Sequence, residues 1–450
     1  MTYSRRTFVK TAGIGSAALA SSPVISLAKA ALANTVEVIN PLNRVPLSFI
    51  IDDSTPLVNM AHFGIPQFAE VFPENYKQDW RSLPREIPDS FVREFGEWCH
   101  ENGVKGKYSI VPYPACTGWV NRFIPGWSKS ELQDSLQLVR DLMMPDWDIH
   151  PEMISHTRAI DIKTGRPFPT ASADFMENWG FSQTKSADEL AAYQAYALQI
   201  LKDVGLPCEG ITTPGGYGSQ NRDNLARGTM EAVRDVFGAE VPHYFRDLFT
   251  EKGKSVAPVV KLASDLDSND PKCVVSVIGC TGDWFGGWDG LTPGDADKFI
   301  TEDLSSGRMV DVIESGEPAI MVCHWPGIYY NGEKKGFNIF KTVVSRLHKK
   351  YDHLLWMKNS EIARYWAAKE LTAFTSSKGK ISIKAPFGTP RFTIRVTDKV
   401  RQPRMVHNGE TTPLQRISDG KALKANTWYK DGSSTVLSFD LAKGASELLL

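Results

Sequence analysis

The sequence predicts an α/β fold, a distorted (β/α) barrel followed by a small C-terminal antiparallel β domain. From Pro46 onward, short apolar runs alternate with amphipathic stretches, as expected for repeated strand and helix units around a mostly parallel sheet. After Glu370 the chain is punctuated by Gly, Pro and Thr, with alternating runs such as residues 391–396. Because 450 residues exceed one typical domain, we expect two. Residues 34–370 would form the barrel and residues 371–450 a β-sandwich-like domain.

Residues 1–33 are expected to be a twin-arginine signal peptide. Arg5 and Arg6 precede an apolar residue and Lys10, and a weakly apolar stretch follows over residues 11–20. Small-x-small cleavage sites lie at residues 28–30 and 31–33. The apolar run is shorter than the roughly 18 residues that a membrane-spanning helix needs. We therefore expect the twin-arginine export machinery as a partner, a periplasmic or secreted location, and no stable membrane insertion.

Within the barrel, buried strands are expected where short apolar runs stop at polar residues or at proline. The first run, residues 47–51, stops at Asp52 and Asp53. The remaining predicted strands are residues 106–111, 148–155, 209–213, 272–278, 319–323 and 353–357.

Helices are expected between these strands, where apolar residues recur at helical spacing. Residues 130–143 have the clearest start signal, with Ser128 or Ser130 as the N-cap and Glu131 in the first turn. The other predicted helices are residues 90–102, 187–204, a segment that begins near residue 222, and residues 337–349.

Composition excludes several classes of partner and site. The formal net charge is −1, from 51 basic and 52 acidic residues, so no basic field for nucleic acid is expected. The 6 cysteines form no CxxC pair, which excludes a zinc ribbon or a thioredoxin-type site. The glycine-rich residues 215–218 lack the P-loop lysine and the G-x-G-x-x-G spacing, so they do not predict phosphate binding.

Functional residues of a parallel barrel lie at the carboxyl ends of its strands, where the loops converge. This rule selects polar residues that follow the predicted strands. They are Asp52, Asp53, His156, the segment 212–217, Asp283 and His324.

Four of these segments, in their order along the chain, resemble the polysaccharide deacetylase family. They are Phe-Ile-Ile-Asp-Asp at residues 49–53, Glu-Met-Ile-Ser-His-Thr at 152–157, Thr-Pro-Gly-Gly-Tyr at 213–217 and Ile-Met-Val-Cys-His at 320–324. The resemblance covers about residues 46–366. It implies a deacetylase-type barrel in which Asp53 and His156 bind a divalent metal, with zinc expected, Asp52 acts as the base and His324 as the acid.

The sequence departs from the family pattern at two positions. The family's second metal-binding histidine lies four residues after the first, where this chain has Ile160, and its base-orienting arginine aligns with Thr212. Asp161 is the preferred replacement ligand, since it lies one residue further and offers an oxygen. His62, in the long loop after the first strand, is the alternative. His150 is disfavoured because a straight strand would place it roughly 20 Å from His156.

Aromatic residues in the loops after several strands favour a carbohydrate substrate, since sugars stack on aromatic faces. The segment 280–289 combines flexible backbone with Trp284 and Trp288. The full predicted substrate-binding set is Trp284, Trp288, Trp325 and Tyr217.

These residues predict an exported metal-dependent hydrolase, a carbohydrate-active enzyme that removes acetyl groups from a glycan. One alternative is a glycoside hydrolase on the same barrel, with an acid and base pair drawn from Asp52, Asp53, Asp161 and Asp283. A second alternative is a glycan-binding protein without catalytic activity.

Overall fold

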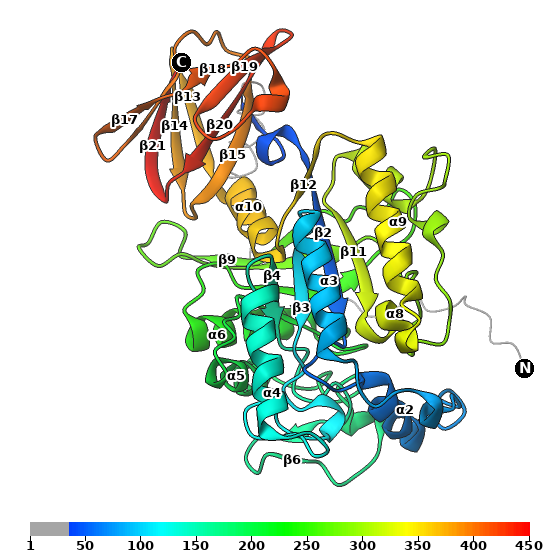
Figure 1. Ribbon diagram of the computed structural model, residues 1–450. Helices are drawn as coiled ribbons and strands as arrows, with labels where there is room; N and C mark the ends of the chain where they lie inside the picture. The colour runs from blue at the N-terminus through cyan, green and yellow to red at the C-terminus, as the bar shows by residue number, and fades with distance from the viewer. Residues whose placement is uncertain (1–35) are drawn as a thin grey trace, which may run out of the picture.

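The protein, seen here in a computed structural model that describes residues 36–450, has two parts (Figure 1). An α/β part carries the helices, and a β-rich part follows at the C-terminal end of the chain. The predicted mixed α/β class with a C-terminal β region is therefore confirmed. The predicted signal peptide, residues 1–33, lies outside the described residues. Within residues 36–450, no helix has both the length and the apolar character that crossing a membrane requires.

The first sheet of the α/β part has the order β11-β2-β3-β4, with β12 paired to the beginning of β2, and these pairings are parallel. Every residue of β2 is buried, as expected for a parallel strand covered on both faces. The bounds are β2 (Val45–Asp52), β3 (Gly106–Ser109), β4 (Trp147–His150), β11 (Ala319–His324) and β12 (Leu354–Trp356).

The second sheet has the order β7-β8-β10-β9, in which β9 alone runs antiparallel to its neighbour. Its strands are β7 (Gly210–Thr212), β8 (His243–Leu248), β9 (Val259–Ser264) and β10 (Lys272–Gly279). The two sheets meet at a single parallel bridge between Glu152 and Thr212, and at a hydrogen bond of 2.8 Å from the Cys280 N–H to the Ile320 carbonyl. Since the ladder is not continuous at these places, the structure does not show the closed form of the predicted barrel.

Helices connect the strands, and serine caps fix where two of them begin. Ser128 and Glu131 form a capping box at α4, and Ser186 and Glu189 form one at α5. The helices are α2 (Met60–Val71), α3 (Asp89–Glu101), α4 (Lys129–Leu138), α5 (Ala187–Asp203), α6 (Arg222–Phe237), α7 (Arg308–Ser315), α8 (Trp325–Tyr329), α9 (Lys335–Lys350) and α10 (Asn359–Leu371).

Shorter elements fill the connections. A π-helical turn, η4 (Val139–Met143), extends α4, and β5 (Ile160–Asp161) pairs with β6 (Arg166–Pro167). The 3₁₀ turns are η1 (Pro41–Asn43), η2 (Trp80–Ser82), η3 (Pro114–Cys116), η5 (Ala173–Phe175), η6 (Ala296–Lys298), η7 (Tyr330–Gly332) and η8 (Gly420–Ala422).

The β-rich part contains two five-stranded sheets, with the orders β1-β15-β20-β19-β18 and β13-β14-β21-β16-β17. Their pairings are antiparallel except between β18 and β19. The strands are β1 (Val36–Val38), β13 (Ala373–Ser377), β14 (Lys380–Ala385), β15 (Thr389–Val396), β16 (Arg404–His407), β17 (Glu410–Pro413), β18 (Gln415–Arg416), β19 (Thr427–Asp431), β20 (Ser434–Leu441) and β21 (Gly444–Leu449).

The sequence did not predict several elements, among them β8, β9 and α7, and the structure differs from the predicted arrangement in three further places. Residues 60–71, expected as a loop, form α2, whose internal Gly64 and Pro66 weaken the helical signal. The first strand of the β-rich part is β1, which pairs with β15 although it lies before the predicted barrel strands. The strand expected over residues 148–155 ends at His150, and the chain then bends, with positive φ angles at Met153 and His156.

Candidate active site

Two acidic residues end β2, and the backbone bends between them. Asp52 is the last residue of the strand, and Asp53 has a φ of 59°, in the left-handed region. Successive residues of an extended strand point to opposite faces, but this bend ends that alternation. Both side chains are buried, and each contacts a different set of partners.

Asp52 forms an ion pair with Lys107, a residue of β3 whose side chain is 0% exposed. The Lys107 ammonium also donates hydrogen bonds to the Ile51 carbonyl, at 2.9 Å, and to Ser109 Oγ, at 2.8 Å. Burial raises the pKa of Asp52 to about 6, although the nearby Lys107 charge opposes this shift. Asp52 is therefore a buried carboxyl held in place by a cation, and its raised pKa suits a group that exchanges protons near neutral pH.

Asp53 faces two residues from the segment that follows β4. The His156 Nε2 atom lies 2.8 Å from Asp53 Oδ1 and 3.2 Å from Glu152 Oε1. The Asp53 N–H donates to Glu152 Oε2 at 2.8 Å. One potential ligand atom from each of the three residues lies within 4.8 Å of the others, and all three residues are buried. Two carboxylates and one imidazole thus converge on one place.

The charges within this group stabilise one another. Burial alone would raise the pKa of Glu152, but the adjacent His156 and Lys107 lower it to about 2. Burial alone would lower the pKa of His156, but Asp53 and Glu152 hold it well above its ordinary value. The Glu152 carboxylate is therefore ionised, as a carboxylate that binds a metal must be.

The atoms present fit a divalent cation. Asp53 Oδ1 is buried and lies 2.8 Å from His156 Nε2, but within residues 36–450 no hydrogen bond satisfies it. A cation among Asp53, Glu152 and His156 would satisfy that atom, and two oxygens with one nitrogen are a ligand set that zinc accepts. The structure thus brings Asp53 and His156 together with Glu152 rather than with Asp161, and the metal-binding role expected of them stays a prediction.

Glu177 fixes the segment that carries His156. This fully buried carboxylate accepts hydrogen bonds from the N–H groups of Ile154 at 3.2 Å, Ser155 at 3.1 Å and His156 at 2.6 Å. Tyr193 donates its hydroxyl to the same carboxylate. Because His156 has a φ of 66°, these hydrogen bonds hold the backbone in a conformation that a non-glycine residue rarely adopts.

His324 ends β11 and is paired with Asp283. Its Nδ1 atom lies 3.0 Å from Asp283 Oδ2, and its N–H donates to Asp283 Oδ1 at 3.3 Å. Burial would lower the pKa of His324, but Asp283 outweighs it and raises the pKa to about 10. The His324 side chain is 27% exposed and that of Asp283 is 23% exposed, so solvent reaches this side of the site. Asp283 therefore favours the protonated form of His324.

The two residues considered as replacement ligands lie in other surroundings. The Asp161 carboxylate accepts hydrogen bonds from the Lys163 N–H and the Thr164 hydroxyl, which makes it part of the turn between β5 and β6. His62 Nδ1 lies 2.9 Å from the Leu83 carbonyl, and the ring packs edge-on against Trp80. The residue that the structure brings together with Asp53 and His156 is instead Glu152, four residues before His156.

The predicted sugar-binding aromatic residues divide into two pairs. Trp325 and Tyr217 are both 0% exposed, so neither ring can present a face to a sugar, which corrects the expectation for these two. Trp284 and Trp288 are partly exposed. Trp288 contacts Phe68 at a ring distance of 6.0 Å, and Phe68 in turn lies 6.4 Å from the His156 ring.

An aromatic group beside His156 was missed from the sequence because half of it comes from the α2 region, expected as a loop. Phe68 and Tyr76 contact each other, and each also contacts Trp179 and Trp288. The ring centroids of these five pairs lie between 5.1 and 6.1 Å apart. These four rings form an apolar wall next to the potential metal ligands.

A second group of potential ligands, Asp148, His150 and His243, lies deeper between β4 and β8. The two histidines are fully buried, and their Nε2 atoms lie 2.9 Å apart. Both Asp148 oxygens accept hydrogen bonds from Ser360, at the start of α10. Burial lowers the pKa of both histidines, so the pair is neutral and hydrogen-bonded.

No protein-family model and no curated protein matches this chain. Among solved structures, it is similar to a protein from Mycobacterium smegmatis described as a polysaccharide deacetylase, with 12% identity, a TM-score of 0.43, and coverage of 76% of this chain and 97% of that one. A protein from Pseudomonas aeruginosa PAO1 with the same description has 13% identity, a TM-score of 0.39, and coverage of 72% and 91%.

A third similar structure comes from Parabacteroides distasonis and is described as a glycoside hydrolase/deacetylase. It has 10% identity, a TM-score of 0.40, and coverage of 78% of this chain and 81% of that one. These identities and TM-scores are too low to assign a family or an activity, so a functional proposal must rest on the chain's own residues.

Proposed function

We propose that this protein is an exported, metal-dependent hydrolase that removes acetyl groups from a glycan. The observation that carries the proposal is the meeting of three units at the carboxyl ends of β2, β4 and β11. They are the Asp52–Lys107 ion pair, the group of Asp53, Glu152 and His156, and the His324–Asp283 pair. A base, a set of metal ligands and an acid are the parts that hydrolysis of an amide or ester needs.

Asp53, Glu152 and His156 would hold a divalent cation, with zinc preferred. When bound, such a cation supplies Lewis acidity, which polarises an acetyl carbonyl and makes water a stronger nucleophile. Glu177 contributes by keeping the His156 backbone in place through its hydrogen bonds to the N–H groups of this segment.

Asp52 accepts the proton of the attacking water, and Lys107 keeps that carboxyl oriented and ionised. His324, which Asp283 keeps protonated, then donates a proton to the leaving amine or alcohol. His324 and Asp52 are partners in the parallel pairing of β11 with β2, so the proposed acid and base lie on adjacent strands.

A glycan substrate is supported by the partly exposed Trp288 and by the aromatic wall beside His156. A glycoside hydrolase would instead need two carboxyl groups free to act as acid and base. Of the carboxyl groups that could act with Asp52, Asp53 lies against His156 and Asp283 against His324, and Asp161 belongs to the turn between β5 and β6. Deacetylation therefore fits the geometry better.

Export is proposed from the sequence alone. The Arg5–Arg6 pair and the cleavage sites after it favour transport by the twin-arginine machinery and a periplasmic or secreted location.

The test is to measure metal content and acetate release from acetylated glycans, using the purified mature chain beside Asp53→Ala and His324→Ala. We expect Asp53→Ala to lose metal and activity together, whereas His324→Ala keeps metal and loses turnover. Equal activity in both variants and the unaltered chain would refute the proposal.

A further inference from the structure

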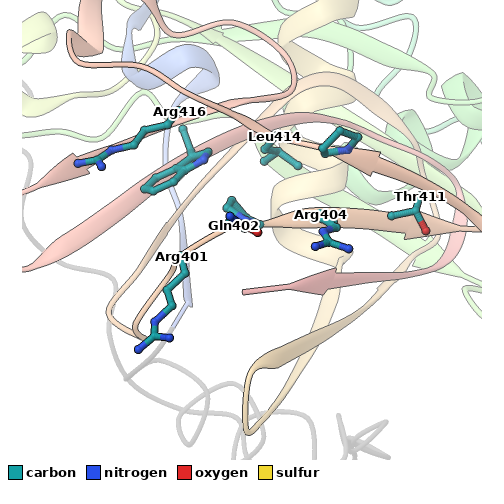
Figure 2. Close-up of a pocket in the computed structure, with 9 residues that line it drawn as sticks. Arg401, Gln402, Arg404, Thr411, Leu414 and Arg416 are labelled. Atoms are coloured by element: carbon teal, nitrogen blue, oxygen red, sulfur yellow. The ribbon is translucent and has the colours of Figure 1, made fainter.

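A groove of about 580 Å³ opens on the β-rich part, between strands at the edges of its two sheets (Figure 2). Its walls come from β17, the edge of one sheet, from β18, the edge of the other, and from the neighbouring β16 and β19. This volume lies within the roughly 300–1,000 Å³ typical of small-molecule sites. The groove is thus large enough to take part of an extended chain.

Three arginines, Arg401, Arg404 and Arg416, line this groove, and no carboxylate does. Within the described residues, none of the three forms an ion pair, whereas the other arginines of the β-rich part do: Arg391 pairs with Glu361, and Arg395 with Glu37. Figure 2 shows the guanidinium groups spread along the groove rather than gathered at one point. As far as residues 36–450 are concerned, the groove therefore offers positive charge without an ion-pair partner at several places.

The uncharged lining suits a sugar. Gln402 and Thr411 offer an amide and a hydroxyl, which match sugar hydroxyls as hydrogen-bond partners. The exposed Pro413 gives an apolar surface for the C–H face of a ring. Arg416 lies over the Trp428 ring, 5.5 Å from its centroid, and this contact holds the guanidinium in position.

Other polyanions fit less well. Trp428 is only 4% exposed, so it offers no free face on which a nucleic-acid base could stack. Binding to an anionic membrane would be aided by apolar side chains that insert, but the exposed large hydrophobic residues of the described chain lie elsewhere. They are Phe123, Leu248, Val259 and Leu291.

We propose that this groove binds a polysaccharide that carries carboxylates, such as a chain of uronic acids. Guanidinium groups recognise carboxylates through paired, charge-assisted hydrogen bonds, which fits arginine rather than lysine at these positions. That the substrate is a glycan rests on the proposed function. The arginines of the groove add that this glycan is acidic.

The groove lies away from the candidate active site. In Figure 1 the β-rich part adjoins the end of the α/β part where β2 begins, whereas α2 lies at the opposite end, where β2 stops at Asp52. In this proposal the groove binds the polymer on the β-rich part, and hydrolysis takes place at the carboxyl ends of the α/β strands.

The test is binding of the full mature chain to polygalacturonate, measured by titration calorimetry. The variant Arg401→Gln/Arg404→Gln/Arg416→Gln is compared with Arg93→Gln/Arg166→Gln/Arg227→Gln, which makes the same charge change at exposed arginines of the α/β part. We expect the groove variant to bind about tenfold more weakly or worse, and the control to bind like the unaltered chain.

Two further arms separate the possible outcomes. The Asp53→Ala variant should still bind polygalacturonate, so that failure of the hydrolase proposal leaves the binding result intact. The groove variant should still hydrolyse a small acetyl ester, since its arginines lie outside the active site. The inference is overturned if the unaltered chain does not bind polygalacturonate, if both arginine variants lose affinity equally, or if neutral dextran binds as tightly.

Discussion

His324 lies directly opposite Asp52 in the parallel pairing of β11 with β2. The two strands are separated by more than 260 residues of chain, yet their pairing brings a cationic imidazole and a buried carboxyl to the same edge of the sheet. Each has a partner of opposite charge, Asp283 for His324 and Lys107 for Asp52. This arrangement provides a proton donor and a proton acceptor on adjacent strands.

The Asp283→Asn variant should lose activity at a lower pH than the unaltered enzyme. His324 donates a proton only below its pKa of about 10, so activity should fall as the pH rises through that value. Removing the Asp283 charge leaves burial opposed only by the smaller effects of Asp53 and Asp52, so the pKa of His324 should fall and the alkaline limb should move down by about 1 pH unit or more. A pH profile of kcat/KM that stays unchanged on the alkaline side would contradict the role of Asp283.

Replacing Glu152 should weaken metal binding, whereas the matching change at Asp161 should not. Glu152→Gln removes a charged oxygen from the group of Asp53 and His156, and we expect affinity for zinc to fall about 100-fold or more. Asp161→Asn alters only a turn. Competition titration with a chromophoric chelator measures both affinities. If Asp161→Asn lost the metal and Glu152→Gln kept it, the ligand assignment would be wrong.

Lys107→Met should lower both stability and turnover. The variant leaves the buried Asp52 without its cation, and breaking a buried pair in this way costs about 3 kcal/mol. Turnover should fall about 100-fold, because Asp52 is then neither oriented nor held ionised.

The double variant Asp52→Asn/Lys107→Met separates these two effects. It removes both charges and should therefore recover most of the stability in urea unfolding while remaining inactive. Recovery of activity in the double variant would show that Asp52 is not the base.

Glu177→Gln should destabilise the segment that carries His156. The amide has one acceptor oxygen instead of two, so at least one N–H among residues 154–156 would lose its partner, at a cost of about 1–3 kcal/mol. Zinc affinity should also fall, about tenfold, because His156 is no longer fixed. Tyr193→Phe removes the hydroxyl donor to Glu177 and the acceptor of the Ile160 N–H, but it leaves both Glu177 oxygens in place for the N–H groups of residues 154–156, so it is the comparison variant. If Glu177→Gln bound zinc as tightly as the unaltered chain, Glu177 would stabilise the fold without contributing to metal binding.

The strands of the fold were predictable wherever burial on both faces produced a continuous apolar run. Residues 47–51 and 319–323 fall within β2 and β11, and residues 272–278 fall within β10. The start of β8 is fully buried, yet its sequence is interrupted by Arg246 and Asp247, so it gave no such signal. Pairing between distant segments, such as β1 with β15, leaves no mark on local periodicity.

Site residues that directly follow a predicted strand could be identified from the sequence. Contacts that depend on which strands are neighbours in the sheet could not. Asp52, Asp53, His156 and His324 do lie at one edge of the sheet, and the metal and catalytic roles expected of them stay predictions. Lys107 was missed because its position beside Asp52 follows from the pairing of β2 with β3. Glu152 has a local signal, its spacing of four residues before His156.

The most direct test of the account is a crystal structure of the mature chain soaked in zinc, with anomalous differences recorded at the zinc absorption edge. The account predicts a peak about 2.0–2.2 Å from Asp53 Oδ1, Glu152 Oε1 and His156 Nε2, at a site that Asp53→Ala abolishes. A peak confined to Asp148, His150 and His243, or no peak at saturating zinc, would contradict it.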